Sequence, residues 1–251
     1  MAKQTGLGDN FYVAGFDLSG DTASLSDIGG GPEALEITGI DKSAVERIGG
    51  LRTGGVSWTS WFNPAAKAQH VALSSLPTAD VQVMYFRGTT LGNPAAACVA
   101  KQINYDPTRG ADGSLTFDVD VESDGFGLEW GTMVTPGIET DTAAANGTGV
   151  ENLAQASTNF GLQAYLQTFD FTGTDVTVKL QESSDDASGD AYTDITGGGF
   201  TQITSGDQHT ERIATATGLT VEQWVRVITT GTFSAFEFAV MFVRNDAAPV
   251  F

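Results

Sequence analysis

Apolar and polar residues alternate along much of the chain, which is the period of a β-strand with one buried face. The clearest runs are residues 55–62, 80–86, 114–122 and 175–182. Thr, Val, Ile, Phe and Gly dominate over the usual helix formers, and glycine alone supplies 31 residues. This composition favours strands joined by tight turns. The pattern therefore predicts an all-β protein.

Residues 64–76 form the one stretch that predicts a helix. Asn63 is a favourable N-cap, Pro64 then occupies the first helical position, and Pro77 ends the stretch. Residues 41–48 are compatible with a further helical turn. Residues 1 to about 35 are rich in turn signals such as Gly29-Gly-Gly-Pro, and they predict an irregular, extended N-terminal arm.

Residues 137–157 interrupt the strand pattern, because they are rich in Gly, Ala, Thr and Asn and contain few large apolar residues. Such a segment is either a linker or a long structured loop. Evenly spaced short strands return after it, as in a compact antiparallel sandwich. We therefore expect a β-sandwich or barrel domain with one short helix over residues 1–140, a linker or loop over 141–157, and a second β-sandwich over 158–251.

The chain is strongly acidic, with a formal net charge of −19. Residues 1–140 carry 8 basic and 17 acidic residues (net −9), and the remainder carries 4 and 14 (net −10). Because nucleic-acid affinity depends on Lys and Arg contacts, we expect no specific nucleic-acid binding. The acidity is explained either by solubility alone or by a wall that repels DNA sliding past it.

Membrane segments and targeting signals are not evident. No stretch approaches the roughly 20 apolar residues of a membrane helix. The first residues, Met1 to Gly6, lack the apolar centre of a signal peptide, so we expect assembly in the cytoplasm. The single cysteine, Cys98, lies among small apolar residues, which indicates a buried structural thiol rather than a nucleophile.

Catalytic and cofactor signatures are likewise missing. The two histidines, His70 and His209, lack further ligands at zinc-site spacing, and no Gly-x-Ser-x-Gly elbow supports a Ser-His-Asp arrangement. The glycine triplets at 29–31 and 197–199 are not followed by the Lys-Ser or Lys-Thr of a phosphate loop. We therefore expect no enzyme activity, no cofactor and no metal.

Three carboxylates share one face of the strand predicted at residues 114–122. They are Asp118, Asp120 and Glu122. The twelve-residue loop of calcium chemistry is missing, so two interpretations stay open: a solvated strand face, or an acidic face that lines a channel.

The tryptophans divide by their surroundings in the sequence. Trp58, Trp130 and Trp224 lie among apolar residues or glycine, which favours core packing. Trp61 faces the other side of its strand from Trp58, and we expect it at an interface.

Residues 45–64, with Gly50-Leu51 and an aromatic strand, resemble the major tail tube proteins of long-tailed bacteriophages, as does the earlier Asp17-Leu-Ser-Gly. The order of features that follows, a helix and a strand over residues 64–86 and a late acidic strand, is also similar. The resemblance covers residues 1–140.

The resemblance implies a structural virion protein of the phage tail, assembled in the host bacterial cytoplasm. Its subunits would form rings that stack into a tube, with Asp118, Asp120 and Glu122 facing the lumen through which DNA passes. Partners would be further copies of the chain and other tail proteins. The N-terminal arm and the loop at 106–113, including Arg109, would contact neighbouring copies.

Residues 158–251 are similar to β-sandwich modules of phage structural proteins, and such a module is either an outer decoration or a second tube domain. Two other functions fit acidic β-sandwiches without enzyme signatures. One is a capsid decoration or fibre protein. The other is a carbohydrate-binding module, which surface aromatics would serve.

Overall fold

The computed structural model describes residues 5–76, 78–151 and 159–245. Strands dominate these residues, and the one helix among them is α1 (Gln69–Leu73). The all-β prediction is confirmed. The strands pair antiparallel throughout.

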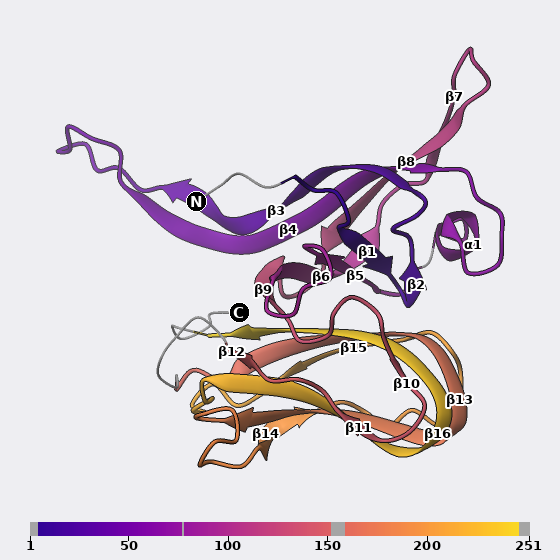
Figure 1. Cartoon of the computed structure of the whole chain (residues 1–251). Coiled ribbons are helices and arrows are strands. Elements are labelled where there is room, and N and C mark those ends of the chain that lie inside the picture. The colour runs from indigo at the N-terminus through magenta and orange to yellow at the C-terminus, as the bar shows by residue number, and fades with distance from the viewer. Residues whose placement is uncertain (1–4, 77, 152–158, 246–251) are drawn as a thin grey trace.

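The chain forms two lobes that lie one above the other in Figure 1. The strands of the N-terminal lobe are β1 (Asn10–Val13), β2 (Phe16–Asp17), β3 (Thr22–Glu36), β4 (Arg47–Trp61), β5 (Val81–Phe86), β6 (Pro94–Gln102), β7 (Asp106–Arg109), β8 (Leu115–Ser123) and β9 (Glu129–Met133). The strands of the C-terminal lobe are β10 (Glu139–Asp141), β11 (Ala145–Asn146), β12 (Val150–Glu151), β13 (Leu162–Ser183), β14 (Thr193–Gly199), β15 (His209–Ala214) and β16 (Trp224–Arg244).

The N-terminal lobe has two layers, one of β3, β4, β7 and β8 and one of β1, β2, β5 and β6. Apolar side chains from both fill the space between them, including Trp58 and Val119 from the first layer and Phe11 and Val83 from the second. β6 joins the layers, because Ala100–Gln102 pairs with β8 while the rest of the strand pairs with β5. The lobe is thus a β-sandwich.

The C-terminal lobe is built on two long strands, β13 and β16, which pair along nearly their whole length. Both bend, so that each contributes to the two layers of a sandwich (Figure 1). β14 and β15 pair with opposite halves of β13, and β10, β11 and β12 pair with β16. The enclosed core contains Leu180, Val227 and Phe236.

The two lobes share one buried core and one continuous sheet. The layer of β1, β5 and β6 is covered on both faces: Phe11 points into the N-terminal core, whereas its neighbour Tyr12 packs with Tyr165 and Met241 of the C-terminal lobe. β9 links the lobes by pairing with both β6 and β16. Burial on both faces explains why β5 and β6 are nearly continuous apolar runs.

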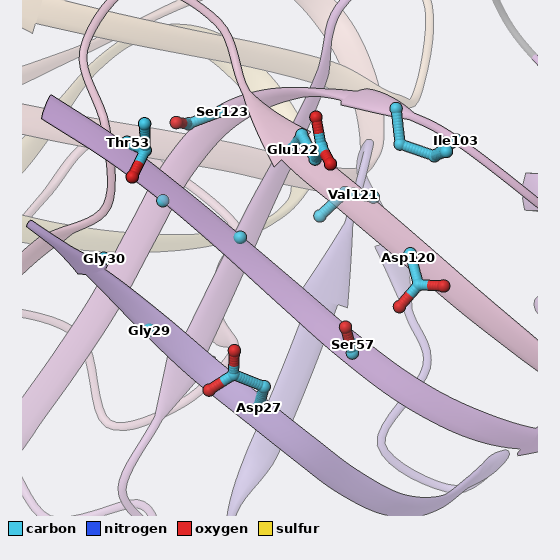
Figure 2. Close-up of a pocket in the computed structure, with 12 residues that line it drawn as sticks. Asp27, Gly29, Gly30, Thr53, Ser57, Ile103, Asp120, Val121, Glu122 and Ser123 are labelled. Carbon is cyan, nitrogen blue, oxygen red and sulfur yellow. The ribbon is translucent and has the colours of Figure 1, made fainter. Parts of the chain in front are cut away.

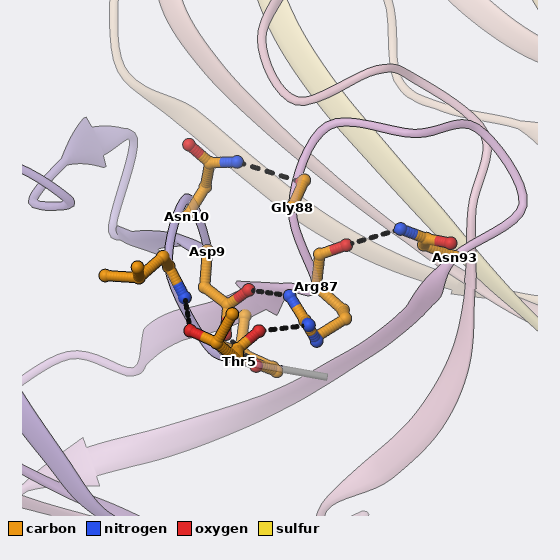
Figure 3. A network of polar contacts seen from close by, with 8 residues as sticks. Thr5, Asp9, Asn10, Arg87, Gly88 and Asn93 are labelled. Carbon is orange, nitrogen blue, oxygen red and sulfur yellow. Dashed lines mark hydrogen bonds and ion pairs between the residues drawn. The ribbon is translucent and has the colours of Figure 1, made fainter. Parts of the chain in front are cut away.

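Residues 5–35 do not form the irregular arm that the turn signals predicted. β1 is a buried core strand, and β3 is a long strand paired with β4. Figure 3 shows how the segment before β1 is held: Arg87 donates hydrogen bonds to the Asp9 carboxylate and to the Thr5 carbonyl, and Asn10 donates to the Gly88 carbonyl at 3.0 Å. Residues 1–4 lie outside the described residues.

The predicted helix is present but begins later than the capping pattern indicated. Asn63 does not cap it; the Asn63 side chain instead accepts a hydrogen bond from the Ala65 amide at 3.1 Å. Lys67 adopts a left-handed φ of 60°, which breaks a helix there. The Asp21 carboxylate accepts from the Gln69 amide at the true start. Residues 41–46 form the turn between β3 and β4, and not a helical turn.

The segment expected as a linker or loop at 141–157 carries strands in its described part. β10 ends at Asp141, and β11 and β12 follow it, each pairing with β16. Residues 152–158 lie outside the described residues. Cys98 is fully buried in the N-terminal core, and burial raises the pKa of its thiol to about 12. The expected buried thiol is confirmed.

Candidate functional site: an acidic sheet face

The outer face of β8 carries the three carboxylates that the sequence places together. Phe117, Val119 and Val121 are buried against the second layer of the lobe. Asp118, Asp120 and Glu122 alternate with them and point to the opposite face. The predicted alternation is present.

Strand register brings further polar groups to this face. Asp118 lies opposite Thr59 of β4 and accepts a hydrogen bond from the Thr59 hydroxyl at 2.7 Å. Asp120 lies opposite Ser57, which in turn lies opposite Asp27 of β3. The Asn104 amide donates to the Asp120 carboxylate at 2.7 Å and fixes its orientation. A fourth carboxylate, Asp27, thus joins the three on β8.

A groove of about 600 Å³ crosses the face between these carboxylates. Figure 2 shows Asp27 on one side of it and Asp120 and Glu122 on the other. Its floor is backbone, because the adjacent strands carry glycine there. A Cβ at Gly54 would lie 2.3 Å from the Leu128 amide nitrogen, and one at Gly30 would lie 2.6 Å from the Thr53 carbonyl oxygen. These two positions face the core beside Leu128, so the close approach of that segment behind the groove requires glycine at both.

The groove has an uncompensated negative charge. Among the described residues, its lining contains carboxylates but no Lys or Arg. Lys101 lies opposite Glu122 on β6, but its ammonium pairs with Asp80 and Asp124 instead. The described residues contain no group of three or more His, Cys, Asp or Glu side chains placed to hold a metal ion. Such a face repels phosphates and offers them no anchoring cation.

Trp61 and Arg109 lie at one end of this sheet, the end next to α1. Trp61 is 49% exposed on the outer face, and Arg109 is exposed on β7. Exposed Phe62, Val71 and Leu76 follow Trp61 in the chain, on and around α1. The Phe62 ring also packs edge-on against the His70 ring, and the two ring centroids are 5.0 Å apart. We call Trp61, Phe62, Val71 and Leu76 the α1-end residues.

The prediction for the other tryptophans is correct for Trp58, which is 1% exposed, and wrong for Trp130, which is 51% exposed. The reason is the neighbour of Trp130 on β9. Glu129 points inward, where its carboxylate pairs with the buried Arg212 at 2.9 Å and accepts a hydrogen bond from Tyr165. Alternation then turns Trp130 outward, edge-on to Tyr85. Trp224 is half-buried.

The far end of β3 and β4 is a feature that sequence reasoning missed. Beyond the Gly29–Gly55 pair the two strands form a ribbon that projects from the lobe (Figure 1). We call residues 30–54 the arm. Its exposed large apolar residues are Leu35, Ile37, Ile40, Val45, Ile48 and Leu51. The signal for this ribbon in the sequence was the mixture of apolar and charged residues over 34–51.

No family model matches the sequence, and no curated protein matches it. Solved structures of tail particles show a distant likeness. A chain of the virion of a native gene transfer agent particle is 14% identical, with a TM-score of 0.40 over 51% of this chain and 98% of that one. The described residues include no helix long and apolar enough to cross a membrane.

Two further structures cover nearly the whole chain. The Dit (gp 19.1) protein of SPP1, described as a paradigm of the hub adsorption apparatus in phages that infect Gram-positive hosts, is 12% identical, with a TM-score of 0.32 over 94% of this chain and 99% of that one. A chain of the phage p2 baseplate is 8% identical, with a TM-score of 0.36 over 95% and 99%. Likenesses this distant assign no function.

Proposed function

We propose that the chain is a structural subunit of a phage tail and that copies of it form rings around a passage for DNA, with the acidic sheet face lining the passage. The observation that carries this is the position of that face. It is the outermost layer of the molecule, opposite the side on which the C-terminal lobe packs. An unobstructed acidic wall keeps DNA mobile, because it provides no counter-charge for the phosphates.

The edges of the same sheet support association. β3 pairs only with β4, and β7 pairs only with β8 among the described residues, so both lateral edges are free. Free edges present unpaired amides and carbonyls to another chain, and a ring of copies covers them. The resemblance of residues 45–64 to tail tube proteins fits the same role. Stacking of such rings into the tail tube is the finer form of the proposal.

The order of the layers also indicates where the C-terminal lobe would lie in a ring. If the acidic face lines the passage, the C-terminal lobe lies on the outside of the ring, because the β1–β5–β6 layer separates the two. It would be held there rigidly by the shared core. We therefore favour an outer position for this lobe over a second lumen-lining domain.

Electron microscopy of the purified chain over a range of concentrations tests the ring. Hollow rings or tubes support the proposal. Isolated trimers that bind capsids would instead indicate a decoration protein, and monomers that bind a glycan array would indicate a carbohydrate-binding module.

Charge reversal tests the passage. The variant Asp118→Lys/Asp120→Lys/Glu122→Lys should still assemble, and its assemblies should bind DNA less tightly as the salt concentration rises. A gel mobility-shift assay on the assemblies measures the bound DNA. The matched variant Asp118→Asn/Asp120→Asn/Glu122→Gln keeps the shape and should retain far less. DNA retention that is equal in the reversed and neutral variants would contradict a lumen position.

A further inference from the structure

Beyond its root, the arm pairs with no strand among the described residues other than its own two. β4 pairs with β8 only from Gly55 onward, so residues 30–54 are held by β3–β4 pairing and by contacts at the root with residues 127 and 128. A two-stranded ribbon by itself is marginal in water. Here it nevertheless carries six exposed large apolar residues, with Ile40 and Leu51 108% and 82% exposed. This combination indicates a segment that becomes covered on association.

A second uncovered apolar set lies at the other end of the same strand. β4 begins in the arm at Arg47 and ends at Trp61, one of the α1-end residues. Fifteen residues at about 3.3 Å each span on the order of 50 Å. The arm of one molecule therefore cannot reach its own α1 end, and each set must be covered by something outside the molecule.

Charge favours another copy as that partner. The arm contains three basic and four acidic residues (net −1), whereas the rest of the chain carries net −18 of the total −19. The arm is thus a segment that can approach this acidic chain with little repulsion. The β7–β8 hairpin also projects from the lobe and carries net −1 over residues 106–115, but none of its residues is an exposed large apolar one, so the arm alone of the two offers apolar surface to a partner (Figure 1).

We propose that the arm of one copy docks on the α1-end residues of a second copy, head to tail. The contact joins two different surfaces, so each copy uses its arm on one neighbour and its α1 end on the other, and repetition closes into a ring. This deepens the proposed function, on which it rests, by naming the surfaces that join neighbours. It also explains why the exposed Trp61 lies at the edge of an otherwise polar sheet face.

Directed disulfide formation tests the contact. Cys98 is buried, so introduced thiols react selectively. Ile40→Cys and Val71→Cys proteins are prepared separately, mixed, oxidised and separated on a non-reducing gel. Head-to-tail docking predicts covalent dimers in the mixture and none from either variant alone. The double variant Ile40→Cys/Val71→Cys should give a ladder that stops at the ring number seen by electron microscopy.

Each outcome decides between the alternatives. Dimers from Ile40→Cys alone would mean that two arms meet tip to tip, and they would overturn the proposal. Rings without mixed cross-links would overturn the head-to-tail contact while leaving the proposed function standing. Single particles at every concentration would overturn both.

Disruption by charge is the complementary test. Ile40→Asp and Leu51→Asp should abolish rings while leaving the melting temperature unchanged, because both side chains are largely exposed in the single molecule. Thr217→Asp, an exposed residue of the C-terminal lobe, adds the same charge and should assemble normally. Ring formation by both arm variants at wild-type concentrations would exclude the arm as the joining element.

Discussion

In the N-terminal lobe, large apolar side chains are exposed at the arm, at the α1 end and at Leu7, Ile103 and Trp130, whereas the described residues beyond Trp130 expose none of that size. The C-terminal lobe encloses its phenylalanines, as at Phe236 and Phe238, which stack 4.7 Å apart. One lobe thus leaves apolar surface for a partner, and the other is complete in itself. The difference suggests that association is a property of the N-terminal lobe, and that the C-terminal lobe is carried by it.

The junction between the lobes determines whether they behave as one body. Gln167 donates hydrogen bonds to the carbonyls of Tyr12 and Gln82, and its side-chain oxygen accepts from the Gly15 amide. Lys67 reaches across to the Phe169 carbonyl. These contacts and the shared core join the lobes, so we expect both to unfold in one transition.

The largest expected effect is at the buried ion pair of the junction. Glu129→Ala should lower the free energy of unfolding by about 3–5 kcal/mol, because it leaves the Arg212 charge buried without its partner. Chemical denaturation followed by fluorescence and by circular dichroism measures this. The double variant Glu129→Gln/Arg212→Gln leaves no unpaired charge and should recover part of the loss. A loss confined to one of two separate transitions would show that the lobes are independent.

A somewhat smaller effect is expected from the apolar part of the junction. Met241→Ala removes a fully buried side chain from the core shared by the lobes and should cost about 2–5 kcal/mol. Leu180→Ala makes a comparable cavity inside the C-terminal lobe alone. If the lobes form one body, both variants shift the same single transition. A Met241→Ala protein that unfolds in two separate transitions would show that the lobes are independent units.

Much of this fold could be predicted from local pattern, because several strands satisfy their burial locally. β8 shows strict alternation, and its carboxylates lie on the predicted face. The arm could not be predicted in this way. Its strands are rich in glycine, and they pair with each other outside any core, so no alternation of buried and exposed residues marks them. The turn signals in β3 were therefore interpreted as an irregular segment.

Other errors have a non-local origin. Trp130 is exposed because Glu129 has a partner 83 residues away in Arg212, which no local pattern reveals. The helix begins at Gln69 because Asp21, distant in sequence, accepts its first amide. The acidic groove illustrates the limit for the site: three carboxylates follow from alternation, but Asp27 joins them only through the register of β3 on β4.

Gly54, on a strand that carries the groove, provides a prediction with a stability effect of intermediate size. Gly54→Ala places a methyl group against the backbone of Leu128, so we expect a loss of about 1–3 kcal/mol as the strands shift. Gly113→Ala is a useful contrast, because its space is open although its φ of 93° disfavours a side chain. Thermal denaturation compares the two. Gly54 has no positive φ, so a Gly54→Ala protein as stable as the wild type would mean that close approach to Leu128 does not require the glycine.

The smallest expected effect concerns pH and the C-terminal lobe. Burial, and secondarily the charge of Asp141, raise the pKa of Glu139 above its usual 4.5. The folded state then binds a proton more tightly than the unfolded state, so the stability contributed by this group falls as pH rises from about 4.5 through the raised pKa. Glu139→Gln should remove this part of the pH dependence and leave the neutral-pH protein slightly more stable than the wild type. Unfolding curves at matched pH values measure the difference, with Glu33→Gln on the exposed arm as the control. A Glu139→Gln protein less stable than the wild type at neutral pH would mean that the carboxylate is stabilised by a partner, and the C-terminal lobe would then depend on charge outside its apolar core.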